Sequence, residues 1–184
     1  MNAIDFLIII LLGVGTIIGF FHGLVRTTAH MLALYFVTIV AAFAYPTMSR
    51  ALRYMAPDSN EQLRAVAGFL LVFLVLFITV FFSIRPTFKK RRDSFIVPGS
   101  VDRLAGLVAG FFLTGLFIGL AFLLSDFLLS VSWVKWEPLR GSFAQLVHSS
   151  PLGSMVRGLL PSAVLTLKPW FAPIGGLPRL FDIR

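Results

Sequence analysis

Four long runs of apolar residues, separated by short polar links, dominate the hydrophobic pattern of the chain. They lie at about residues 4–21, 29–45, 65–84 and 104–125. A helix needs about 20 mainly apolar residues to cross the hydrocarbon core of a bilayer, within a range of about 17 to 25. The pattern therefore predicts four membrane-spanning helices.

Short links and prolines set the expected boundaries of these helices. The link at 22–28 is so short that the first two runs form an antiparallel hairpin if both cross the membrane. Proline disfavours the helical conformation in the residue before it, so the second run is expected to end at Pro46 and the third at Pro86. A re-entrant first segment is the alternative to a full span, because three glycines could interrupt it: Gly13, Gly15 and Gly19.

The chain changes character from residue 131 onward, where proline becomes frequent while the sequence stays apolar. Six of the ten prolines lie in this tail, so long helices are not expected there. Apolar pieces with spaced charges lie between the prolines, at residues 143–147, 152–160 and 163–171. These pieces suit short amphipathic helices in the membrane interface. A disordered tail, the alternative, fits the apolar composition badly.

Tryptophan supports an interfacial tail, because this side chain is enriched at the depth of the lipid headgroups. The tail contains all three tryptophans of the chain: Trp133, Trp136 and Trp170. We therefore expect a transmembrane domain over residues 1–130 and a Pro-rich amphipathic tail over 131–184.

Composition agrees with an all-α polytopic membrane protein. Of the 184 residues, 58% are hydrophobic and only 13% are charged, whereas soluble domains carry about 25% charged residues. Too little charge is present to cover a water-facing surface. Cysteine is absent, which excludes disulfides and thiol chemistry. Asp5 stands where a signal peptide would carry basic residues, so we expect the first segment to remain as a membrane helix.

The formal charge of +8 is concentrated in the links between apolar runs. This distribution is typical of the positive-inside bias of membrane proteins, and no basic and aromatic residues interleave on a polar face as nucleic-acid binding would require. A basic cluster follows the third run: Arg85, Lys89, Lys90, Arg91 and Arg92. It is interpreted as a stop-transfer signal, with binding to anionic headgroups or a partner as the alternative. The bias places the 85–103 loop in the cytoplasm and both termini outside it.

Glycines repeat at helical spacing in two of the apolar runs. Gly15, Gly19 and Gly23 lie four residues apart on one helix face, and Arg26 follows them. A second group opens the fourth run: Asp102, Arg103, Gly106 and Gly110. Small residues at this spacing let membrane helices approach closely.

We therefore hypothesise that the two glycine faces pack together and that Arg26 pairs with Asp102 to fix the helix register. The alternative is that both charges face headgroups, with Arg26 acting as a topology signal.

Catalytic and metal-binding patterns are not found in the sequence. His22 and His30 are eight residues apart and His148 lies in the tail, so no pair has the spacing of metal ligands on one helix turn. Two serines follow His148, but sequence neighbours do not supply the carboxylate that orients a catalytic triad. Asp5 and Asp126 lie near the ends of apolar segments, where a charge costs less than at the centre. We predict no catalytic residue, metal or cofactor.

The combined pattern resembles the bacterial colicin V production protein (CvpA) family over about residues 2 to 161. The features that carry the resemblance are Asp5, the repeat from Gly19 to Arg26, the motif from Asp102 to Gly110, Trp133 and Leu160-Pro161. The resemblance implies an inner-membrane protein of four helices that is associated with production or export of the peptide toxin colicin V and with envelope integrity. Some related proteins carry an extracytoplasmic protease domain after the helices, and no such domain follows here.

The resemblance favours a non-enzymatic accessory or assembly factor in toxin production and envelope maintenance. A small oligomeric transporter or channel is the main alternative, and a lipid-organising protein acting through its amphipathic tail is a third. The expected partners are the lipid bilayer, including anionic lipids, and a membrane or export protein or a second copy of the chain. Nucleic acid is not expected as a partner.

Overall fold

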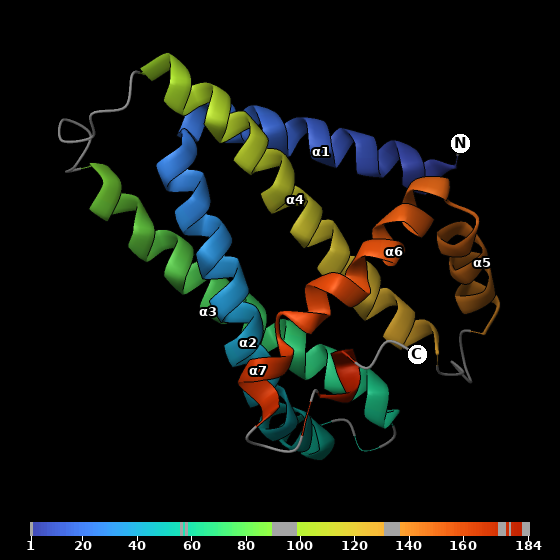
Figure 1. The fold of residues 1–184 in the computed structure, drawn as a ribbon. Coiled ribbons are helices and arrows are strands. Elements are labelled where there is room, and N and C mark those ends of the chain that lie inside the picture. The colour runs from blue at the N-terminus through green and yellow to red at the C-terminus, as the bar shows by residue number, and fades with distance from the viewer. Residues whose placement is uncertain are drawn as a thin grey trace.

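The computed structural model describes residues 2–55, 57, 59–89, 99–130, 137–172, 176 and 178–181. All regular structure in this part of the chain is helical (Figure 1). The first four helices are α1 (Ala3–His22), α2 (Leu24–Met55), α3 (Glu61–Lys89) and α4 (Gly99–Leu129). The C-terminal part forms α5 (Glu137–His148), α6 (Pro151–Leu165), α7 (Lys168–Phe171) and the 3-10 helix η2 (Arg179–Phe181).

The prediction of four membrane-spanning helices is confirmed. Helices α1 to α4 are each long and apolar enough to cross a bilayer, so the chain is an all-α membrane protein. Helix α1 is continuous over 20 residues and is not interrupted at its glycines. Much of its surface is apolar and exposed, as suits a helix in contact with lipid.

Two predicted helix boundaries are wrong, because α2 and α3 both continue through a proline. Helix α2 runs past Pro46 to Met55, and α3 runs past Pro86 to Lys89. Proline removes one backbone donor, but its fixed φ remains compatible with a helix. Around Pro46 the packing is close: a Cβ added to Gly68 of α3 would lie 3.2 Å from the carbonyl oxygen of Tyr45. Contact with α3 thus supports α2 where local propensity would end it.

A single glycine joins α1 to α2, in place of the longer link expected at 22–28. Gly23 has φ of 76°, a conformation that glycine adopts without the cost of a Cβ clash. The two helices diverge from this point (Figure 1). Helix α1 then packs along α4, and α2 packs along α3. The first two helices therefore do not pack as the expected antiparallel hairpin.

The C-terminal helices fold back onto the four long helices, and α6 crosses α4 (Figure 1). Helix α6 is 15 residues long and continues through Pro161, whereas two separate pieces were expected at residues 152–160 and 163–171. Its apolar face is buried, and Leu160 packs against α4 at Gly119. The free energy gained by this burial offsets the loss of the backbone hydrogen bond that Pro161 cannot make. Whether the tail lies in the interface stays a prediction.

The expected belt of tryptophans is described only in part. The indole N–H of Trp170 donates a hydrogen bond to the hydroxyl of Tyr35 on α2, at 3.0 Å. Trp133 and Trp136 lie outside the described residues.

Aromatic side chains of α7 and η2 pack against α2 and α3. Phe171 of α7 is fully buried and stacks on Phe43, with ring centroids 4.5 Å apart. Phe181 of η2 is buried against Phe69 of α3, at 5.8 Å between centroids. Such pairs contribute beyond the area they bury. The C-terminal segment is therefore part of the same core as the long helices.

The Phe171→Ala substitution tests this contribution. Truncating a fully buried phenylalanine typically costs about 3 to 5 kcal/mol, so we expect a clearly lower midpoint of thermal unfolding in detergent. Phe82→Ala is the matched control, because that ring is 59% exposed and its loss leaves no cavity. Equal effects of the two substitutions would contradict the buried role of Phe171.

Candidate functional site

The antiparallel contact between α1 and α4 brings backbone against backbone. A Cβ added to Gly106 would lie 2.5 Å from the carbonyl oxygen of Gly19, and one added to Gly110 would lie 2.6 Å from that of Gly15. Neither position has space for a methyl group. The glycines therefore set the distance between the helices, and we call this contact the glycine seam: Gly15, Gly19 and Gly23 against Gly106, Gly110 and Thr114.

Asp102 closes one end of the glycine seam by capping α2. Its Oδ1 accepts a hydrogen bond from the backbone N–H of Leu24, the first residue of α2, at 2.9 Å. The first N–H groups of a helix lack partners within that helix, and a carboxylate there also complements the helix dipole. A Cβ on Gly23 would lie 2.9 Å from Cγ of Asp102, so glycine leaves room for this approach.

The hypothesised pair between Arg26 and Asp102 is not formed. Among the described residues, no ion pair joins the two side chains. The carboxylate of Asp102 is held by the start of α2 instead. Because an aspartate side chain is short, Asp102 bonds the backbone N–H of Leu24 that lies next to it. Arg103 follows in the first turns of α4.

Asp5 lies at the other end of the α1–α4 pair, where it holds the start of α6. It is only 1% exposed. Its Oδ1 accepts hydrogen bonds from the hydroxyl of Ser150 and from the backbone N–H of Leu152, while Oδ2 accepts from the backbone N–H of Asn2. The Ser150 hydroxyl in turn accepts from the N–H of Gly153. Asp5 thus joins the first helix to a segment about 145 residues later in the chain.

Sequence reasoning missed Ser150 and Thr114. Ser150 before Pro151 is a typical start signal for a helix, so the N-cap of α6 could have been found, although its partner Asp5 could not. Thr114 lies opposite Gly15, where an added Cβ would approach Cβ of Thr114 to 2.7 Å. It continues the glycine pattern one turn beyond Gly110, and a wider definition of small residues would have included it.

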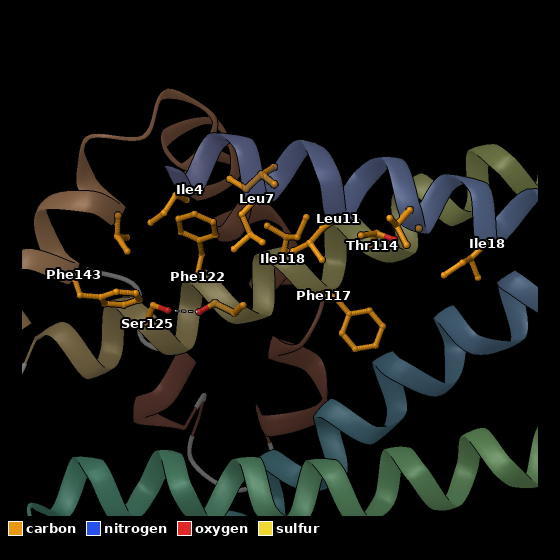
Figure 2. Close-up of a pocket in the computed structure, with 15 residues that line it drawn as sticks. Ile4, Leu7, Leu11, Ile18, Thr114, Phe117, Ile118, Phe122, Ser125 and Phe143 are labelled. Atoms are coloured by element: carbon orange, nitrogen blue, oxygen red, sulfur yellow. Dashed lines mark hydrogen bonds between the residues drawn. The ribbon is translucent and has the colours of Figure 1, made fainter. Parts of the chain in front are cut away.

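An apolar groove runs between α1 and α4 from the Gly15–Thr114 end of the glycine seam toward α5 (Figure 2). Its volume is about 510 Å³. Isoleucine, leucine and phenylalanine side chains dominate its walls. The hydroxyls of Thr114 and Ser125 donate to carbonyl oxygens of their own helix. The groove therefore presents hydrocarbon to its surroundings; its residues on α1 extend from Ile4 to Ile18, about 21 Å at ~1.5 Å per residue.

Two histidines that are eight residues apart in the sequence line a second cavity, of about 250 Å³. The break at Gly23 places the rings of His22 and His30 6.2 Å apart. Each Nδ1 lies within hydrogen-bond distance of a carbonyl oxygen four residues earlier, so Nδ1 donates. No group of three or more potential metal ligands occurs among the described residues. The cavity wall is otherwise mostly apolar and aromatic.

The remaining predicted site residues lie away from the glycine seam. Asp126, near the end of α4, is close to Arg157 of α6 and His148 of α5. Arg85 and Lys89 lie in the last turns of α3. The rest of the basic cluster lies outside the described residues: Lys90, Arg91 and Arg92. Binding of this cluster to headgroups therefore stays a prediction.

Comparison with known proteins identifies a family for this chain. A family model described as Colicin V production protein matches residues 4–161. The match extends from α1 into α6, so it includes both helices of the glycine seam and both partners of the bond between Asp5 and Ser150. No curated protein and no solved structure matches the chain.

Alanine at two glycines of α1 tests the seam. In Gly19→Ala the added methyl group would meet the backbone of Gly110, 2.6 Å from its Cα, so the helices must separate and we expect a loss of about 1 to 3 kcal/mol. In Gly13→Ala nothing lies within 4 Å of the added Cβ. Because alanine is a better helix former than glycine, this substitution should leave the free energy of unfolding unchanged or raise it by up to about 1 kcal/mol. Thermal unfolding in detergent measures both, and equal stabilities would contradict the seam.

Alanine at two serines tests the bond at the other end. Ser150→Ala removes the hydroxyl that donates to buried Asp5 and accepts from the N–H of Gly153. We therefore expect the free energy of unfolding to fall by about 1 to 3 kcal/mol. Ser154→Ala is the matched control, because its exposed hydroxyl bonds only the nearby carbonyl of Pro151, and it should change stability by about 0.5 kcal/mol or less. Limited proteolysis of the tail is the second measurement, and Ser150→Ala should be cut faster. Equal cleavage of both variants would refute the role given to Ser150.

Proposed function

This chain belongs to the colicin V production protein family, and from that premise we propose that it is a non-enzymatic accessory or assembly factor. Its role would lie in the production or export of colicin V-type toxins and in maintenance of the cell envelope. We further propose that it resides in the bacterial inner membrane with both termini outside the cytoplasm. The distribution of Lys and Arg around the 85–103 loop supports this orientation.

The observation that carries the proposal is the use of the acids at the two ends of the α1–α4 pair. Asp5 accepts three hydrogen bonds, and Asp102 accepts one from the start of α2. Both carboxylates therefore hold helices in place. A carrier of ions or polar solutes needs ionisable or polar groups along its path, and these two acids are already committed to the fold.

The walls of the groove support the same conclusion. Its two hydroxyls donate to carbonyl oxygens of α4, and the other wall residues are almost all apolar. Such a surface favours contact with an apolar membrane component over passage of a hydrated solute. Together with the rigid glycine contact, this supports a scaffold that assembles with other membrane components, with no transported substrate of its own.

A complementation experiment tests the proposed function. In a colicin V-producing strain that lacks its own family member, we expect this chain and Gly13→Ala to restore toxin activity in the medium and resistance to detergent. Gly19→Ala should restore less of both. The amount of each protein in the membrane must be measured alongside, so that loss of function is separated from loss of protein.

A flux assay in liposomes separates the proposal from transport. An accessory factor should give no ion or solute flux above that of empty liposomes. Flux that is abolished by Asp126→Asn would establish the transporter instead. Failure to restore toxin activity or detergent resistance at normal protein level would also contradict the accessory role.

A further inference from the structure

A cluster of three ionisable side chains lies where α4, α5 and α6 meet, away from the glycine seam. The guanidinium of Arg157 lies 2.7 Å from Nδ1 of His148 through its NH1 group, and NH2 donates to the carbonyl oxygen of Val147. Its central carbon lies 5.8 Å from the centre of the Phe122 ring. Arg157 is thus held against α5 and α4 at the same time.

The bond between Arg157 and His148 defines the protonation state of the histidine. A guanidinium only donates hydrogen bonds, so Nδ1 of His148 must offer its lone pair and the ring is neutral, with its proton on Nε2. His148 is exposed, so it can exchange protons with water. Histidine is the side chain that ordinarily changes charge between about pH 5 and 8. A proton on Nδ1 would remove the acceptor and place two cations side by side.

Asp126 offers a second position for the same guanidinium. Its Oδ1 and the Nε of Arg157 are both buried, and neither has a hydrogen-bond partner among the described residues. Arg157 and His148 are the charged groups that act on Asp126, yet no described ion pair joins Asp126 to either. A buried polar atom without a partner is costly, and an ionisable residue near membrane depth is a functional candidate whose counter-ion should be named.

Two further acids on the neighbouring helices α1 and α5 are already engaged. From α1, Asp5 is held by Asn2, Ser150 and Leu152. On α5, Glu137 accepts hydrogen bonds from Arg140. Asp126 is therefore the acid that is available to pair with a released Arg157.

We propose that His148, Arg157 and Asp126 form a proton-operated switch. A proton binding at Nδ1 of His148 breaks the bond to Arg157, and the guanidinium then pairs with Asp126 through its Nε–H. No covalent bond changes other than the N–H formed on the imidazole. Because Phe122 lines the apolar groove (Figure 2) and Arg157 lies over its ring, the switch connects pH to the α5 end of the groove. It stands independently of the accessory role.

Nuclear magnetic resonance of the full chain in detergent micelles tests the switch. The arginine Nε–H signal of Arg157 is assigned by its loss in Arg157→Lys. We expect this signal to shift in one step between about pH 8 and 5. In His148→Gln, which keeps an acceptor but does not titrate, the step should vanish. In Asp126→Asn the shift should fall by at least half.

Arg140 provides the internal control, because its Nε–H donates to Glu137 at 2.8 Å on the same helix as His148 and should not respond to His148→Gln. An Arg157 signal that stays constant in the wild type, or that shifts equally in Asp126→Asn, would overturn the proposal.

Thermal unfolding gives a second measurement. Asp126→Asn should lower the unfolding temperature at pH 5.5 more than at pH 7.5, because only the acidic state uses the carboxylate as the partner of Arg157. An equal change at both pH values would likewise overturn the switch.

Discussion

Direct backbone contact between α1 and α4 is the constraint on which the other features depend. Gly19, Gly106 and Gly110 leave no space for a Cβ between the helices. Lipid tails are as apolar as leucine, so membrane helices gain little hydrophobic stabilisation from each other, and close packing has to supply it. With the two backbones held at this distance, the positions of the helix ends are fixed. The acids at those ends then come within reach of donors from other parts of the chain.

Each end of the helix pair uses an aspartate to hold the start of a further helix. Asp102 of α4 accepts the N–H of Leu24 in α2, and Asp5 of α1 accepts the N–H of Leu152 in α6. Helix starts carry unpaired N–H groups and a partial positive charge, so a carboxylate compensates both. Holding the start of a helix therefore explains both acids near membrane depth, and neither needs a role in transport. It is also the reason that we propose an accessory role and not a carrier.

Three prolines inside helices show how packing can outweigh a local preference. Pro46, Pro86 and Pro161 each lie within a helix that composition would end earlier. For α2 and α6, close contacts with α3 and α4 are visible at these positions. The loss of one backbone hydrogen bond at a proline is a local cost, whereas the burial gained by extending the helix depends on a neighbour that the sequence pattern does not specify.

Four features could be read from the sequence alone, because composition and hydrophobic length act residue by residue along the chain. They are the membrane class, the number of spanning helices, the absence of a disulfide framework and the family resemblance. The glycines of the seam and the acids at the ends of the α1–α4 pair were located in the same way. Helix packing alone brings Asp102 to Leu24 and not to Arg26, Asp5 to Ser150, and Arg157 to His148. It also leaves Oδ1 of Asp126 without a hydrogen-bond partner among the described residues. These bonds act over about 3 Å between segments far apart in the chain, so they depend on how the helices pack and not on any local pattern.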